Sequence, residues 1–176
     1  VVCTVPAAIA GKLLEKAADE QLRGVPLQAA MLAVFGVVLW TVDRVTARGD
    51  DSGEVTWMQA LTMGVAQCLA LVPGVSRSGI TMTAGRATGL ARVSAARFSF
   101  LLATPITAGA LVLKLHKMPH DVPAGTMVIG VVTAALTGIL AIEVLMAMLR
   151  RTGFGVFAVY RVLVAVGALA WWFLHR

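Results

Sequence analysis

A charge-free run at residues 25–42 places the tightest limit on what this chain can fold into. It reads VPLQAAMLAVFGVVLWTV. About 20 predominantly apolar residues in a helix cross the ~30 Å hydrocarbon core of a bilayer, and this run nearly reaches that length. Three further apolar runs follow at residues 95–115, 126–149 and 154–174. The sequence therefore predicts an all-α, polytopic integral membrane protein with four transmembrane helices.

The composition supports the same class. Hydrophobic residues make up 59% of the chain and charged residues 14%, with a mean hydropathy of +0.85. Soluble domains are about half apolar and a quarter charged. The net charge is +6, but the basic residues lie between apolar runs, as in membrane proteins. They do not form a basic face with interleaved aromatic residues, so we expect no nucleic-acid partner.

Shorter apolar segments complete the predicted architecture. Residues 1–14 resemble the end of a partial N-terminal helix, and they contain no basic leader. Residues 57–72 and 80–90 are two short arms around Pro73-Gly74, which predicts a re-entrant helix–loop–helix. The polar segment 43–54 is expected to lie in water as a loop. We interpret residues 1–176 as one transmembrane domain that lacks an N-terminal portion.

The loop between the two short arms carries the chemistry. It reads LVPGVSRSGITMT over residues 71–83. An arginine at membrane depth costs at least ~2.5 kcal/mol, so Arg77 needs a partner or a function. Its guanidinium, the neighbouring hydroxyls and the free N–H groups of a helix beginning near Ile80 favour a tetrahedral anion such as phosphate. In the alternative interpretation, Arg77 snorkels or pairs with a carboxylate while the serines cap a helix.

The segment ALVPGVSRSGITMTAGRATGL (residues 70–90) resembles the PGxSRSGxT signature of the bacterial undecaprenyl-diphosphate phosphatase family, which is associated with bacitracin resistance. Residues 94–110 and 150–162 agree with the family as well, so the resemblance covers nearly the whole chain. It implies a multi-pass protein of the bacterial plasma (inner) membrane that converts undecaprenyl diphosphate to undecaprenyl phosphate for cell-wall synthesis. By the resemblance, the catalytic residues are Arg77, Ser76 and Ser78, and the substrate-binding residues are Gly74, Gly79 and Thr81.

The chain departs from the family in one respect. The family carries an earlier (E/Q)xxxE motif followed by a serine and a histidine, and no such motif in an apolar setting occurs here. The chain therefore resembles the C-terminal two-thirds of a family member. The resemblance implies a divalent cation, Mg²⁺ or Ca²⁺, but its ligands are not expected among these residues. We expect the chain to be inactive alone and to contact membrane lipid, and a homodimer is a possible assembly.

Three alternatives stay open. A broken helix that faces an anion is also typical of transporters, so a polyprenyl-phosphate transporter or flippase is the alternative function. Arg86, Arg92 and Arg97 follow the motif, and they form either a basic rim for anionic headgroups or ordinary charges that flank a membrane segment. Arg161 either pairs with an acidic group or braces the site, and a structural role is favoured.

Overall fold

The computed structural model describes residues 2–11, 24–46, 49, 54–115 and 123–175, and these form helices and turns without a strand. Residues 5–11 are helical, as the prediction of a partial first helix requires. Four helices are long and apolar enough to cross a membrane, which confirms the predicted fold class. The elements, in chain order, are η1 (Val2–Thr4), α2 (Val25–Val45), α3 (Trp57–Ala66), η2 (Gln67–Leu71), α4 (Arg77–Ala87), α5 (Arg92–Leu115), α6 (Ala124–Arg151) and α7 (Gly155–Leu174).

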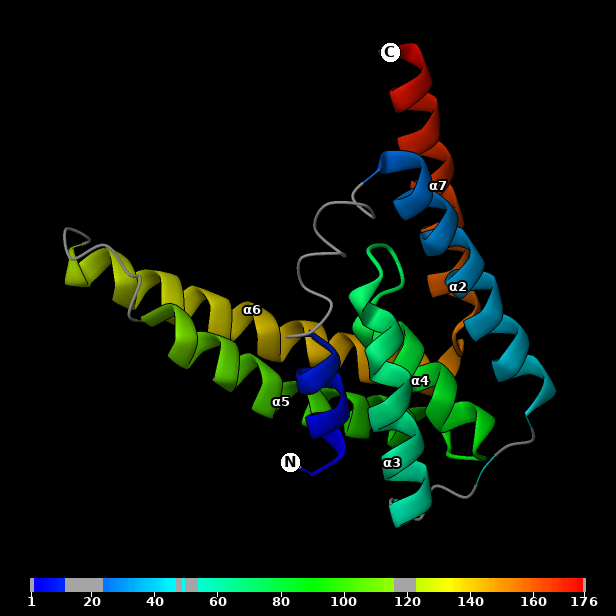
Figure 1. Ribbon diagram of the computed structural model, residues 1–176, viewed down its shortest axis with the longest axis horizontal. Helices are drawn as coiled ribbons and strands as arrows, with labels where there is room; N and C mark the ends of the chain where they lie inside the picture. The colour runs from blue at the N-terminus through cyan, green and yellow to red at the C-terminus, as the bar shows by residue number, and fades with distance from the viewer. Residues whose placement is uncertain (1, 12–23, 47–48, 50–53, 116–122, 176) are drawn as a thin grey trace.

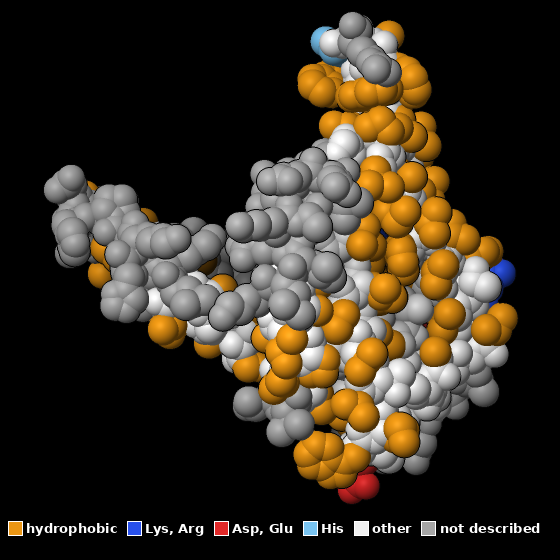
Figure 2. Space-filling view, in the orientation of Figure 1, with side chains coloured by type: hydrophobic (Ala, Val, Ile, Leu, Met, Phe, Trp, Pro, Cys, Tyr) orange, Lys and Arg blue, Asp and Glu red, His pale blue; other side chains and the backbone are white. Residues whose placement is uncertain are grey.

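Helices α2 and α7 lie side by side and run in opposite directions (Figure 1). Gly36 lets them approach closely, because a Cβ atom there would lie only 3.2 Å from the Cβ of Arg161. Small residues at helix contacts are the usual means of packing in lipid, where no hydrophobic effect drives helices together. Hydrophobic side chains cover the visible outer faces of this pair (Figure 2), as expected for surfaces that meet acyl chains.

The predicted helix–loop–helix is present as α3, η2, a short loop and α4. Helix α3 begins with a capping box in which Thr56 and Gln59 satisfy each other's backbone N–H groups. The chain then breaks at Pro73-Gly74, and Gly74 has a φ of 96°. A side chain at Gly74 would overlap the backbone carbonyl of Gln28, so α2 packs directly against the loop.

Helix α4 lies at the centre of the fold, and its residues 79–86 are all buried. Ala84 belongs to one apolar cluster and Met82 to another, so α4 joins the two halves of the core. Helices α5 and α6 form a hairpin that extends away from the other helices (Figure 1). Along α6 most described side chains are exposed, and Leu149 near its end is buried.

The prediction that residue 43 begins a loop in water is wrong. Helix α2 continues to Val45, and the side chain of Asp43 is only 4% exposed. Two arginines from distant segments neutralise this carboxylate inside the protein. A buried charge that is paired and hydrogen-bonded can persist where an isolated one cannot.

Candidate functional site

A strained turn opens α4. Ser76 has a φ of 65° and a ψ of 116°, and it is the one non-glycine residue with positive φ among those described. Such a backbone conformation costs about 1–3 kcal/mol and persists where the surrounding structure enforces it. As the N-cap of α4, Ser76 accepts a hydrogen bond at its Oγ from the Gly79 N–H at 3.3 Å. The Oγ of Ser78 lies 3.5 Å from the Oγ of Ser76.

Arg161 of α7 holds this turn from the other side. Its Nη2 donates hydrogen bonds to the carbonyl of Val75 at 2.8 Å and to that of Gly74 at 3.2 Å. A Cβ at Gly79 would lie 2.5 Å from the Arg161 Nη1, so the glycine makes room for the guanidinium. Of the two interpretations of Arg161, the structure favours the one in which it braces the site.

The turn and Arg161 enclose a small hollow of about 180 Å³. Ser76, Ser78, Gly79 and Arg161 supply its polar wall. Its apolar wall comes from α2, α4, α6 and α7, through Leu39, Met82, Leu145, Phe154 and Phe157. The structure therefore brings three of the sequence-predicted site residues together around one space, and it adds an arginine from α7.

Arg77 lies next to this hollow in the chain but does not line it. Its side chain is exposed and makes no hydrogen bond or ion pair with any described residue. The N–H groups of Arg77 and Ser78 belong to the first turn of α4, where a helix has no internal acceptor for them. The exposed end of α4 thus presents a free guanidinium, two hydroxyls and unpaired backbone donors, a set that suits an anion.

Thr81 lies behind the turn rather than at its surface. Its side chain is fully buried, and its Oγ1 is 2.6 Å from the Oγ of Ser99 on α5. The same hydroxyl donates to the carbonyl of Arg77 at 2.9 Å. In this structure Thr81 ties the first turn of α4 to α5. Ser99 was not predicted from the sequence, because one serine in an apolar helix offers little signal.

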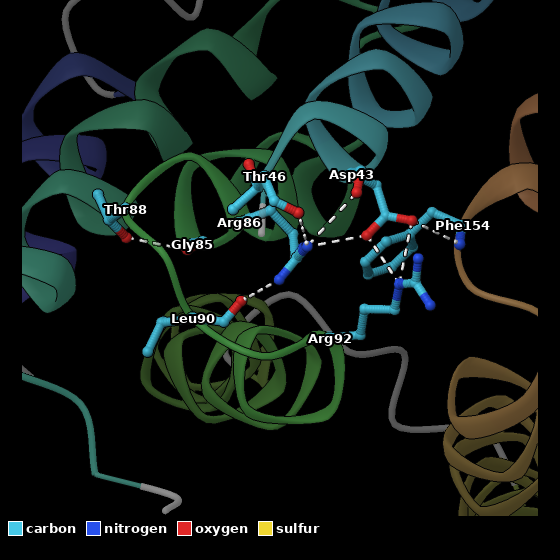
Figure 3. Close-up of polar contacts among 8 residues, drawn as sticks. All are labelled: Asp43, Thr46, Gly85, Arg86, Thr88, Leu90, Arg92 and Phe154. Carbon is cyan, nitrogen blue, oxygen red and sulfur yellow. Dashed lines mark hydrogen bonds and ion pairs between the residues drawn. The ribbon is translucent and has the colours of Figure 1, made fainter. Parts of the chain in front are cut away.

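A second polar cluster lies at the opposite end of α4 (Figure 3). Asp43 accepts hydrogen bonds from the Nε of Arg86 at 2.9 Å, from the Nε of Arg92 at 2.8 Å and from the N–H of Phe154 at 3.4 Å. Arg86 is 2% exposed and also donates to the carbonyl of Leu90. The interpretation of Arg86 as a flanking surface charge is therefore wrong, because the residue is buried and paired.

Comparison with known proteins gives a consistent result. Residues 1–167 match the family described as "Bacitracin resistance protein BacA". An "Undecaprenyl-diphosphatase" of Moorella thermoacetica is 45% identical over 177 residues, covering 100% of this chain and 67% of the relative. Proteins of the same name from Gemmatimonas aurantiaca and Trichlorobacter lovleyi are 46% and 45% identical, each covering 97% of this chain and 64% of the relative.

The chain thus spans about two-thirds of the length of the curated relatives that it matches. Its four apolar helices and its PGVSRSG turn agree with a match that extends over nearly every residue. On these grounds, this multi-pass membrane chain belongs to the bacitracin resistance protein BacA family.

Proposed function

We propose that the protein, at the length of its relatives, removes the terminal phosphate of undecaprenyl diphosphate. The product, undecaprenyl phosphate, would serve again as a lipid carrier in cell-wall synthesis. The observation that carries the proposal is the strained Ser76 turn, where an unpaired Arg77 and the start of α4 face outward together. The relatives are named as phosphatases, which favours this function over a transporter.

Each polar group at the turn has a role in this proposal. The guanidinium of Arg77 binds two oxygens of the diphosphate, and the α4 N-terminus adds backbone donors and a partial positive charge. The hydroxyls of Ser76 and Ser78 contact the same group. Phosphoryl transfer places charge on the phosphoryl oxygens in its transition state, and fixed donors stabilise that charge without reorganising. Arg161 acts as a positioning residue because it holds the carbonyls of Gly74 and Val75.

A divalent cation is part of the proposal for the protein at its relatives' length. Among the described residues, no group of three or more His, Cys, Asp or Glu side chains lies close enough together to hold a metal ion. The described residues therefore do not fit the cation. Loss of activity on chelation, with recovery on adding Mg²⁺ or Ca²⁺, is the expected behaviour.

A homodimer is also proposed. Helix α6 exposes apolar side chains on one face, such as Val132, Leu136 and Leu140, which follow one another at four-residue intervals. A second copy could cover this face, and so could lipid. Cysteines introduced singly at Val132 and Leu136 are expected to crosslink between copies in membranes. The absence of a crosslinked band at both positions would count against the dimer.

Phosphate release from undecaprenyl diphosphate tests the function directly. The assay uses the protein extended to the length of its relatives, reconstituted in vesicles. Arg77→Ala is expected to lower turnover roughly 100-fold, the scale of losing one oxyanion donor. Arg97→Ala is the matched control, because Arg97 is also an exposed arginine but lies outside the turn. Turnover that is unchanged in Arg77→Ala would overturn the proposal.

A further inference from the structure

A basic cavity lies far from the Ser76 turn, beyond the other end of α4. Its volume is about 610 Å³, and it is bordered by the C-terminal ends of α2 and α6 and the start of α5. Asp43 is the one carboxylate among the described residues that line it. Five arginines line the same space: Arg44, Arg86, Arg92, Arg150 and Arg151.

The charges in this cavity do not balance within the described part of the chain. Asp43 is already engaged by the Nε atoms of Arg86 and Arg92 and by the Phe154 N–H. Arg44 and Arg151 form no ion pair with a described residue. Like charges that face one space repel one another unless an anion lies between them. The cavity therefore has the electrostatics of an anion site, and its guanidinium forks fit phosphate oxygens.

An apolar groove adjoins the basic cavity. It lies along α2 and α7, has a volume of about 740 Å³, and is lined by Val37, Trp40, Val156, Val159, Val162 and Leu163 among others. Arg44 lines both the groove and the basic cavity, so the two spaces meet there. The guanidinium of Arg44 also lies 4.7 Å from the centre of the Trp40 ring. Tryptophan and arginine at a helix end are typical of the membrane interface, where one end of a site is wet and the other apolar.

We propose that an anionic phospholipid binds here, with its phosphate in the arginine cavity and an acyl chain in the α2–α7 groove. A charged head and an apolar tail are needed to fill both spaces at once. Basic pockets between transmembrane helices bind acidic lipid headgroups by this means. The site is separate from the Ser76 turn, since Arg77 and Arg86 lie near opposite ends of α4. It does not rest on the proposed phosphatase activity.

The test measures lipid binding by native mass spectrometry and by thermal unfolding in neutral detergent. Phosphatidylglycerol, phosphatidylcholine, undecaprenyl phosphate and inorganic phosphate are compared. We expect phosphatidylglycerol to bind most tightly and to raise the midpoint of unfolding. The variant Arg44→Gln/Arg151→Gln should bind it roughly 30-fold more weakly, on the scale of two interfacial charges. Arg150 is left intact because it also borders a hollow that contains Glu143.

Three controls separate the parts of the site. Arg44→Lys/Arg151→Lys keeps both charges and should retain most of the binding. Arg77→Gln removes a charge at the other end of α4 and should bind phosphatidylglycerol as the unaltered protein does. Val159→Trp narrows the groove and should weaken the phospholipid while leaving any binding of inorganic phosphate unchanged.

Several outcomes would overturn the proposal. Equal binding of phosphatidylcholine would remove the role of the charges, and an unaffected Arg44→Gln/Arg151→Gln variant would remove the role of the cavity. If inorganic phosphate alone gave the full thermal shift, the site would be one for the free anion. Preferential binding of undecaprenyl phosphate that is lost in Arg44→Gln/Arg151→Gln and kept in Arg77→Gln would assign the site to the carrier lipid instead of a bilayer phospholipid.

Discussion

The Nη2 of Arg161 on α7 lies 2.8 Å from the carbonyl oxygen of Val75, in the turn that opens α4. The two residues are 86 positions apart in the chain. This contact fixes the backbone of a buried valine while the next residue, Ser76, stays exposed at the surface. The helix that carries Arg161 therefore sets the shape of a turn to which it contributes no backbone.

Replacing Arg161 with lysine is expected to impair activity through geometry. Lysine keeps the charge, but its side chain differs in shape and does not hold a nitrogen where the Arg161 Nη2 contacts both carbonyls. We expect kcat for phosphate release to fall at least about tenfold, with a smaller change in KM, because the positioned turn acts on the transition state. Tyr160→Phe is the matched control, since Tyr160 is 64% exposed. A kcat that Arg161→Lys leaves intact would show that the contact only stabilises the fold.

The backbone strain at Ser76 can be separated from its hydroxyl. Ser76→Gly relieves the positive φ, so the protein should be at least as stable as before. Ser76→Ala keeps the strain and loses the cap to Gly79, which should lower the free energy of unfolding by about 1 kcal/mol. Denaturant titration in detergent measures the difference between the two variants.

Under the proposed function both Ser76 variants lose a hydroxyl from the phosphate site. Turnover should then fall by a similar factor in each. Their stabilities should still differ, because Ser76→Gly is expected to be at least as stable as the unaltered protein and Ser76→Ala less stable. Full turnover in Ser76→Gly would show that the hydroxyl has no part in catalysis.

Gly74 and Gly89 offer a matched pair. Their φ angles are 96° and 88°, but a Cβ at Gly74 would overlap the Gln28 carbonyl, whereas a Cβ at Gly89 would meet nothing within 4 Å. Gly89→Ala should therefore lower the free energy of unfolding only by the cost of holding alanine in a left-handed conformation, about 1–2 kcal/mol. Gly74→Ala should cost more, because the loop must also move away from α2. Equal thermal shifts in the two variants would contradict the close packing of the loop on α2.

Replacing the two arginines that contact Asp43 should lower the free energy of unfolding by very different amounts. Arg86→Gln breaks a pair in which both side chains are almost fully buried, and we expect a loss of about 3–5 kcal/mol. The side chain of Arg92 is 38% exposed, and Arg92→Gln should cost about 1 kcal/mol or less. Unfolding measurements on the two single variants and the double variant would give the coupling. A larger loss of unfolding free energy in Arg92→Gln than in Arg86→Gln would make Arg92–Asp43 the main ion pair instead.

The hydropathy pattern along the chain predicted the long helices, because each is an apolar run of sufficient length. Helix α7 is Gly155–Leu174 against an expected 154–174, and α6 is Ala124–Arg151 against 126–149. The pattern failed at Asp43, since hydropathy treats every charge as hydrated. Its burial depends on Arg86, 43 positions later, and no local signal carries that pairing.

The residues of the candidate site were likewise predicted from the sequence only in part. The turn residues Ser76, Ser78 and Gly79 lie within four consecutive positions, so one motif was enough to group them around the hollow. Arg161 reaches that hollow from a different helix, and the sequence signals for it were a charge inside an apolar run and the agreement of residues 150–162 with the family. The catalytic and substrate-binding roles of the motif residues stay predictions until activity is measured.

The hydrogen bonds of Asp43 also set an order for events during biosynthesis. Its first partner, Arg86, is made 43 residues after it, and the Phe154 N–H comes 111 residues after it. At translation rates of about 5–20 residues per second, roughly 5–20 s pass before the last donor is available. Until Arg86 and Arg92 have been made, the carboxylate must stay at the wet face of the bilayer, because burial of an unpaired charge is too costly. The full set of contacts between the ends of α2, α4, α5 and α7 forms only when Phe154, at the start of α7, has also been made.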